Sequence, residues 1–134
     1  VSGDAEVCGR AEICDRSMIS DSAKVYAKAI VYDCALVGLL SEVYGEATVG
    51  GSALIWASAE VKENSSVSGR SIINGDSVIS GDATIDGRAN IIDSKISGDV
   101  RIDGVAYIMA SEIDNGYFGD YDRIVDEKRL EENP

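Results

Sequence analysis

The side chains in this sequence that could do chemistry are carboxylates and three cysteines, because the chain contains no histidine. Cys8, Cys14 and Cys34 form no CxxC motif, and their odd number gives no closed set of disulfides. A catalytic thiol needs a neighbouring base, and no histidine is present to supply one. We therefore expect ordinary reduced cysteines, as in cytosolic proteins.

The carboxylates are spread along the chain without converging on one segment, as at Asp4, Glu42, Glu60, Asp76 and Asp82. General acid–base catalysis needs two such groups within reach of one substrate. The segment DNGYFGDYD, residues 114–122, is acidic but lacks the D-x-[DN]-x-[DN]-G spacing of a calcium loop, so it is interpreted as a turn. We expect no catalytic residue, no metal site and no cofactor.

The chain is strongly acidic, with 24 Asp and Glu against 12 Lys and Arg and a net charge of −12. Binding to nucleic-acid phosphates or to an anionic membrane surface is therefore disfavoured. The sequence has neither a run of 18 apolar residues nor a signal-peptide pattern, so we expect a protein that is cytoplasmic or part of a larger assembly. Because it begins at Val1 without a methionine, we also expect a piece of a longer protein.

A six-residue repeat positions these side chains. Every sixth residue is Val or Ile: Val1, Val7, Ile13, Ile19, Val25, Val31, Val37, Val43, Val49, Ile55, Val61, Val67, Ile73, Ile79, Ile85 and Ile91. Ala or Ser stands two residues before each of these from Val7 onward, and Gly or Asp commonly stands two residues after. β-Branched residues favour strands, and Gly and Asp favour tight turns. The period predicts short strands joined by corners, with the aliphatic and the small residue facing inward.

Hexads such as VSGDAE, VYGEAT and ISGDAT match the pattern [LIV]-[GAED]-x-x-[STAV]-x. The chain therefore resembles the hexapeptide-repeat family of left-handed parallel β-helices, in which three hexads form one triangular coil. The resemblance implies an all-β solenoid over residues 1–110, with about six coils of about 18 residues each. It is closest in style to insertion-poor members that are labelled as transferases and have no assigned role.

The repeat shifts by one residue after Ile91, because the next aliphatics are Ile96, Ile102 and Ile108. We expect one tighter corner there. Residues 111–134 differ in composition, and Asp120 could cap a short helix over about residues 121–132. The sequence thus predicts a C-terminal cap or docking segment.

Residues one coil apart should stack on the outside of such a solenoid. One stack forms an apolar stripe with its neighbours: Met18, Leu36, Leu39, Leu40, Leu54, Trp56 and Ile72. Exposed apolar patches commonly mark contacts. The stripe could be a self-association face, a seat for the C-terminal segment or a ligand surface. A second feature comprises Tyr26, Tyr32 and Tyr44, which could stabilise the solenoid wall or bind sugars.

The resemblance also limits the activities. Acyltransferases of the family typically form trimers, bind an acyl donor between subunits and commonly use a histidine base, and carbonic anhydrases of this fold bind metal through three histidines. This chain has no histidine. We favour a non-catalytic scaffold or interaction module that self-associates, with a trimer as the favoured state. The alternative is an acyltransferase relative whose catalytic residues lie outside this chain.

Overall fold

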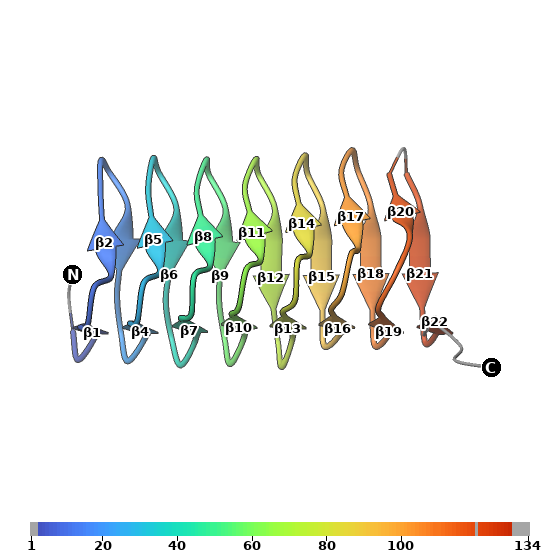
Figure 1. Cartoon of the computed structure of the whole chain (residues 1–134). Coiled ribbons are helices and arrows are strands. Elements are labelled where there is room, and N and C mark those ends of the chain that lie inside the picture. The colour runs from blue at the N-terminus through green and yellow to red at the C-terminus, as the bar shows by residue number, and fades with distance from the viewer. Residues whose placement is uncertain (1–2, 120, 130–134) are drawn as a thin grey trace.

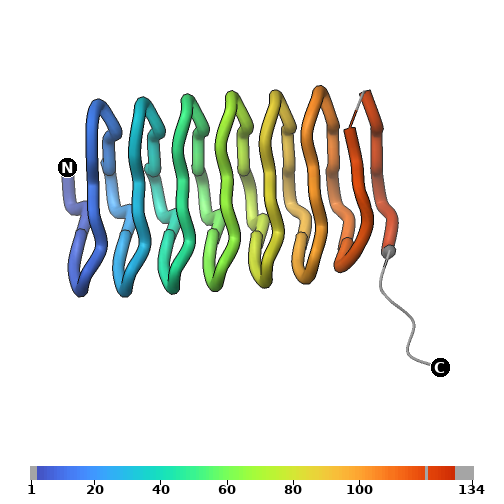
Figure 2. Tube along the Cα trace, turned by 45° about the horizontal axis from the view of Figure 1, so that its top comes forward, coloured from blue at the N-terminus to red at the C-terminus, as the bar shows by residue number. Residues whose placement is uncertain are grey.

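The computed structural model describes residues 3–119 and 121–129, and within them it contains strands, turns and no helix. Its 22 short strands form three parallel sheets, one of eight strands and two of seven. The chain visits the sheets in turn, so the strands build about seven triangular coils stacked along one axis (Figure 1). The first and the last described strands lie at opposite ends of this prism (Figure 2).

The three sheets are named A, B and C in the order in which the chain meets them. Sheet A contains β1 (Glu6–Val7), β4 (Lys24–Val25), β7 (Glu42–Val43), β10 (Glu60–Val61), β13 (Val78–Ile79), β16 (Lys95–Ile96), β19 (Glu112–Ile113) and β22 (Lys128–Arg129). Sheet B contains β2 (Glu12–Ile13), β5 (Ile30–Val31), β8 (Thr48–Val49), β11 (Ser66–Val67), β14 (Thr84–Ile85), β17 (Arg101–Ile102) and β20 (Tyr117–Phe118). Sheet C contains β3 (Met18–Ile19), β6 (Leu36–Val37), β9 (Leu54–Ile55), β12 (Ile72–Asn74), β15 (Asn90–Ile92), β18 (Tyr107–Met109) and β21 (Arg123–Val125).

The inward positions follow the hexad pattern. Each Val or Ile at the aliphatic position from Ile19 to Ile113 has no exposed surface, and from Ala23 onward the residue two positions before each aliphatic is buried beside it. The first coil differs, because Val7 and Ile13 are only half-buried at the open N-terminal end. Each coil therefore buries its apolar interior against its neighbours, as expected for a solenoid.

The corners use backbone conformations that Gly and Asp favour. In the regular corners the second residue after the aliphatic has positive φ, as at Asp15 and Gly51. At Gly51 a side chain would also lack space, because a Cβ there would lie 2.7 Å from the carbonyl oxygen of Gly69 in the next coil. Backbone N–H groups of one coil donate to carbonyls of the next, as from Glu6 N to Ala23 O at 2.9 Å. Stacked coils thus satisfy one another's backbone.

The coils become shorter toward the C-terminus. The register pairs Glu6 with Lys24 in the first coils but Val78 with Lys95 further along, so the later coil is shorter by one residue. In the last coil Tyr107 pairs with Arg123, and the coil has lost one residue more. The tighter corner predicted between Ile91 and Ile96 is present. Three more five-residue spacings follow, from Ile108 to Ile113, from Ile113 to Phe118 and from Ile124 to Arg129.

A ladder of serines supports the shortened corner between sheets C and A. The Ser94 hydroxyl donates to Ile92 O at 2.8 Å and accepts the N–H of Ser111 at 3.1 Å. Ser77 accepts the N–H of Ser94 at 3.2 Å, and Ser111 accepts the N–H of Glu127 at 3.0 Å. Where a coil is one residue shorter, the serine hydroxyl therefore accepts a hydrogen bond from a backbone N–H of the next coil.

Two expectations need correction. The solenoid has about seven coils rather than six, because strands continue to Arg129. The helix predicted over residues 121–132 is wrong in the described residues, where β21 and β22 pair with the preceding coil. Parallel pairing to β18 and β19 outweighs the local helix signals of this charged segment. Residues 130–132 of that prediction lie outside the described residues.

Candidate functional surface

The predicted apolar stripe lies on sheet C. Met18, Leu36, Leu54 and Ile72 occupy equivalent positions in successive strands, as the stacking of regular coils predicts. Met18 is 55% exposed, and Leu36, Leu54 and Ile72 are half-buried because each packs beside its neighbours in the ladder. The sheet therefore presents an apolar ridge that follows the prism axis.

Trp56 lies on the same face, against a glycine. A Cβ placed on Gly38 would overlap the Trp56 indole, so the ring covers the glycine of the preceding coil. The absence of a side chain at Gly38 lets the indole lie low on the sheet, which explains why Trp56 is half-buried. Sheet C thus carries one flat aromatic ring beside the aliphatic ridge.

Leu39 and Leu40 lie at the corner between sheets C and A. Leu39 adopts positive φ, 55°, and its N–H donates to the Asp21 carboxylate of the preceding coil at 3.3 Å. Leu40 is 65% exposed. The two leucines line a shallow hollow of about 260 Å³ with Asp21, Ser22, Ala57 and Ser58. The apolar surface therefore extends around the edge of sheet C.

The apolar surface also continues beyond the predicted residues. Asn74 pairs with Ile92, Ile92 with Met109, and Met109 with Val125, so three more apolar side chains follow on sheet C. Counting one regular coil from Asn74 predicts Ile92 at the next position of the ladder. The same count fails for Met109 and Val125, because the coils that follow are shorter. Between the two apolar parts lies Asn90, whose Oδ1 is the one buried side-chain oxygen or nitrogen without a hydrogen-bond partner in the described chain.

Residues 111–119 and 121–129 do not pack over the stripe, because they form the last coils. Met18, Leu36, Leu54 and Trp56 are therefore not covered by this part of the C-terminal segment. A cap or docking role for the segment as a whole stays a prediction.

The predicted tyrosines are divided between two faces. Tyr26 and Tyr44 stack on sheet A with ring centroids 4.8 Å apart and planes at 2°. Tyr32 lies on sheet B, where its ring covers Gly50 in the way that Trp56 covers Gly38. The three rings do not form one platform, and stacking within the wall accounts for the contacts of all three.

Two carboxylates lie beside the tyrosine stack. Partial burial and a hydrogen bond with Glu60 raise the pKa of Glu42. Burial, followed by the charge of Glu42, raises the pKa of Tyr26. Sheet A therefore has a cluster of acids in the regular coils, whereas Glu112 and Lys128 form an ion pair at 3.6 Å in the last coils.

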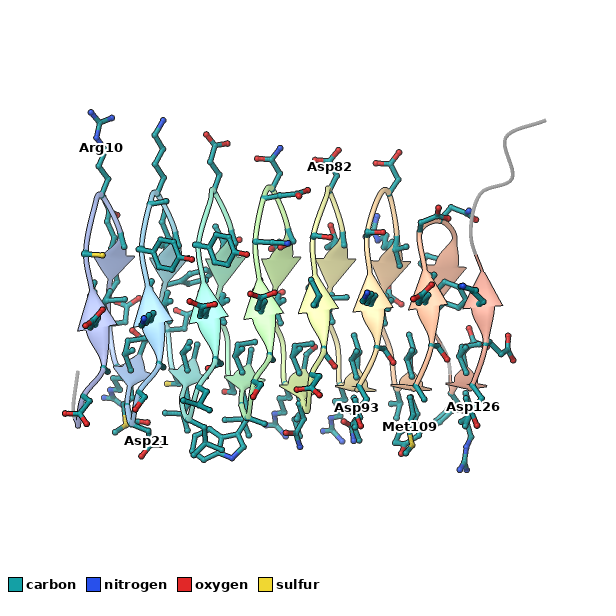
Figure 3. All side chains as sticks on the ribbon, turned by 90° about the horizontal axis from the view of Figure 1, so that it is seen from below. Arg10, Asp21, Asp82, Asp93, Met109 and Asp126 are labelled. Atoms are coloured by element: carbon teal, nitrogen blue, oxygen red, sulfur yellow. The ribbon has the colours of Figure 1, made fainter. Side chains whose placement is uncertain are left out.

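Charged side chains gather on the corners and on sheet A. Figure 3 shows Arg10 and Asp82 on one corner and Asp21, Asp93 and Asp126 along the opposite corner. Among the described residues, no group of three His, Cys, Asp or Glu could hold a metal ion. The three cysteines are free, with Cys8 and Cys34 exposed. In the part of the chain that the structure describes, no helix is long and apolar enough to cross a membrane.

Sheet C stands apart from this pattern. Its outward residues are Met18, Ser20, Leu36, Gly38, Leu54, Trp56, Ile72, Asn74, Asn90, Ile92, Tyr107, Met109, Arg123 and Val125. Arg123 is the one charged residue among them. In a protein of net charge −12, this sheet is the face that a second protein could approach with the least repulsion and the most apolar contact.

Comparisons with protein-family models, with curated proteins and with solved structures return no match. The hexapeptide-repeat resemblance therefore rests on the hexads and on the solenoid that they form.

Proposed function

We propose that this protein is a non-catalytic β-solenoid scaffold that binds further copies of itself through the apolar surface of sheet C. The observation that carries the proposal is the nearly uncharged, apolar character of that one sheet in an acidic protein. Exposed apolar patches of this extent on soluble proteins commonly mark protein contacts.

The size of the face fits a reversible contact. Seven strands spaced by about 4.8 Å span about 29 Å, and six residues per side of the coil give a width of about 20 Å. One face therefore offers roughly 600 Å² per copy, or roughly 1,200 Å² for a pair, at the lower limit of standard specific interfaces. We expect association that depends on concentration.

A second copy is favoured because its ridges have the same spacing. Side chains on sheet C repeat once per coil, so the ridges of one copy can lie in the grooves of another over many coils. The resemblance to hexapeptide-repeat proteins favours a trimer, in which the corner residues Leu39 and Leu40 would contact a neighbour together with the face. A cytoplasmic location, or a place in a larger assembly, belongs to the same proposal.

The test is sedimentation of the wild type and of a Leu54→Glu, Trp56→Glu variant. We expect the wild type to self-associate and the variant to sediment as a monomer of 14.1 kDa, because two carboxylates would be buried without partners at the contact. A Ser66→Glu, Thr84→Glu variant adds the same charge to sheet B and should associate like the wild type. A wild type that is monomeric throughout would contradict the proposal.

The rival is an acyltransferase relative that obtains its catalytic residues from elsewhere. Calorimetry with an acyl-CoA separates the two proposals. The scaffold predicts no saturable heat of binding, and a clear saturable isotherm would contradict it.

A further inference from the structure

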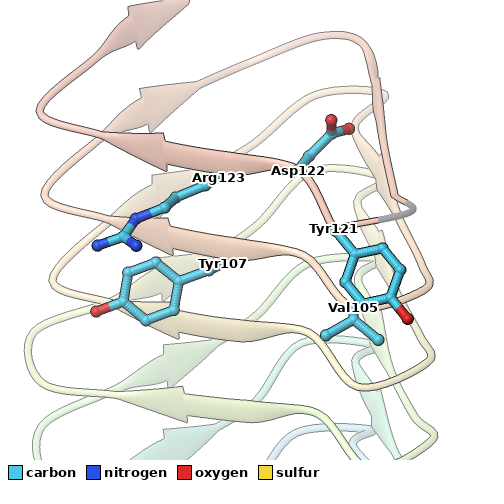
Figure 4. Close-up of a pocket in the computed structure, with 5 residues that line it drawn as sticks. All are labelled: Val105, Tyr107, Tyr121, Asp122 and Arg123. Atoms are coloured by element: carbon cyan, nitrogen blue, oxygen red, sulfur yellow. The ribbon is translucent and has the colours of Figure 1, made fainter.

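A hollow of about 410 Å³ lies at the corner between sheets B and C in the last two coils. It is lined by Val105, Tyr107, Tyr121, Asp122 and Arg123 (Figure 4). Its lining combines two aromatic rings with a guanidinium and a carboxylate, and no residue of the proposed contact in the first coils belongs to it. Tyr107 and Arg123 lie on β18 and β21, so the hollow is at the C-terminal end of sheet C, away from Leu54 and Trp56 on β9.

An altered turn creates the hollow. In the two preceding turns of this corner, positive φ falls on Gly87 and Gly104, the second residue after the aliphatic. In the last turn Tyr121, the third residue, has φ of 75°. Asp122 stands where Ala106 is buried one coil earlier, but it is exposed, and its carboxylate accepts the N–H of Gly119 at 2.9 Å. The turn thereby holds the Tyr121 ring outward, where it is 81% exposed.

Among the described residues, Arg123 has an aromatic partner and no carboxylate partner. Its guanidinium lies over the Tyr107 ring, 5.3 Å from the centroid, and it forms no ion pair within the described residues. Stacking on an aromatic ring orients the guanidinium and leaves its N–H groups available in the plane. A guanidinium fixed in this way is suited to a carboxylate, which it can bind through two parallel hydrogen bonds.

The surroundings narrow the class of ligand. An apolar aromatic molecule is held best in an enclosed pocket, whereas this hollow is open and Tyr121 lies largely in water. A sugar ring can pack one face on a tyrosine while its hydroxyls stay hydrated. The net charge of −12 repels polyanions and phosphates more strongly than a single carboxylate.

We propose that this hollow binds an acidic sugar, a hexuronate, with the carboxylate on Arg123 and the sugar ring against Tyr121. The Asp122 carboxylate, already fixed by the Gly119 N–H, can accept a hydrogen bond from a sugar hydroxyl. For a ligand the size of one sugar in an open site, a Kd of about 1 mM is expected.

The test is a titration of the full chain with glucuronate, followed through the tyrosine ring signals by NMR. We expect saturable shifts and an affinity at least about tenfold higher than for glucose, because glucose lacks the carboxylate. Arg123→Gln should lower the glucuronate affinity by about tenfold or more, and Tyr121→Ala should lower it for both sugars. Tyr121 is largely exposed, so its removal leaves the core intact.

Arg101→Gln is the matched control. Arg101 occupies the same position of the repeat, directly before the inward aliphatic, but lies on β17 of sheet B, where it is exposed and does not line the hollow, so its loss should leave the affinity unchanged. The Leu54→Glu, Trp56→Glu variant should also bind glucuronate normally, which separates this site from the self-association surface. Absence of glucuronate binding, equal binding of glucose, tighter binding of benzoate, or an equal loss in the Arg101 variant would each overturn the proposal.

Discussion

The regular coils of the N-terminal two-thirds and the shortened coils that follow solve the same packing problem with different corners. As far as Ile113 an aliphatic side chain and a small residue face inward in both regions, and the parallel pairing between strands continues to the last coil. The shortened coils lose residues only from turns, as at Asp93 and Ala110, where positive φ is retained. The paired strands and the core therefore determine the fold, and differences in coil length occur in the corners.

The outward side chains of the two regions also differ. The regular coils carry the aliphatic ridge of sheet C and the rings laid over Gly38 and Gly50. The shortened coils carry the serine ladder and the hollow at Tyr121. Each region therefore has its own candidate surface, and variants placed at equivalent positions can test whether the two regions differ as described.

The largest expected effect on the free energy of unfolding comes from core substitutions, which can be compared between the two regions. Ile73→Ala in a central coil should lower the free energy of unfolding by about 2–5 kcal/mol, because the cavity is enclosed by coils on both sides. Ile124→Ala in the last coil should cost less, since among the described strands β21 pairs on one side only, with β18. Urea denaturation measures both. Equal losses would contradict a stability that is built from neighbouring coils.

The serines provide the next comparison. Ser94→Ala should cost about 1–3 kcal/mol, because it removes the acceptor of the Ser111 N–H as well as a hydrogen bond to Ile92 O. Ser65→Ala in a regular coil should cost less than about 1 kcal/mol, since its hydroxyl only donates to carbonyls and accepts no backbone N–H. Chemical denaturation of both variants measures the two losses of stability. A Ser65 variant as unstable as the Ser94 variant would show that the ladder has no special role.

A third variant tests the aromatic cover of the regular coils. Gly38→Ala should destabilise the fold by about 1–3 kcal/mol, because the added methyl group overlaps the Trp56 ring. Trp56 is the only tryptophan, so its emission reports the displacement directly. Adding Trp56→Ala should remove most of the penalty of Gly38→Ala, and additive losses would contradict the contact.

The smallest effect concerns the charges on sheet A. Because burial and the Glu60 hydrogen bond raise the pKa of Glu42 above its ordinary value of 4.5, the folded protein retains this proton to a higher pH than the unfolded chain does. The stability associated with Glu42 is therefore fully present below pH 4.5 and falls as the pH rises through the raised pKa.

Glu42→Gln should accordingly raise stability at pH 7 by about 0.2–1 kcal/mol, the scale of a cross-strand pair, and flatten the dependence between pH 4.5 and 7. Glu112→Gln in the shortened coils should instead lower stability slightly, because Glu112 pairs with Lys128. Thermal melts across this pH range measure both, and the same sign for the two variants would refute the contrast.

The sequence predicts the solenoid because the hexad repeat carries the inward pattern in full, from Ile19 to Ile91 and again from Ile96 to Ile108. It does not reveal the last coil, because the spacing falls to five residues, Phe118 replaces an aliphatic, and Arg129 stands at the register position of Ile113. The charged composition there favours a helix locally, and pairing with the preceding coil determines the strand.

The candidate surface is predictable to the same extent. Stacking residues one regular coil apart places Met18, Leu36, Leu54 and Ile72 together, and the structure has them in one ladder. The hollow at Tyr121 depends on a turn with positive φ at an unusual position and on an aspartate in an alanine position. Neither the repeat nor the residue composition predicts that turn conformation, so the hollow is found from the structure and not from the sequence.

Self-association through sheet C is tested most directly by a dilution series in which Trp56 emission and molar mass are measured on the same samples. Trp56 is the single tryptophan and lies in the proposed contact on sheet C. We expect the mass to fall toward 14.1 kDa on dilution while the emission shifts to longer wavelength over the same concentrations, as the indole becomes exposed to water. A mass of 14.1 kDa at all concentrations, or dissociation without a change in Trp56 emission, would contradict self-association through sheet C.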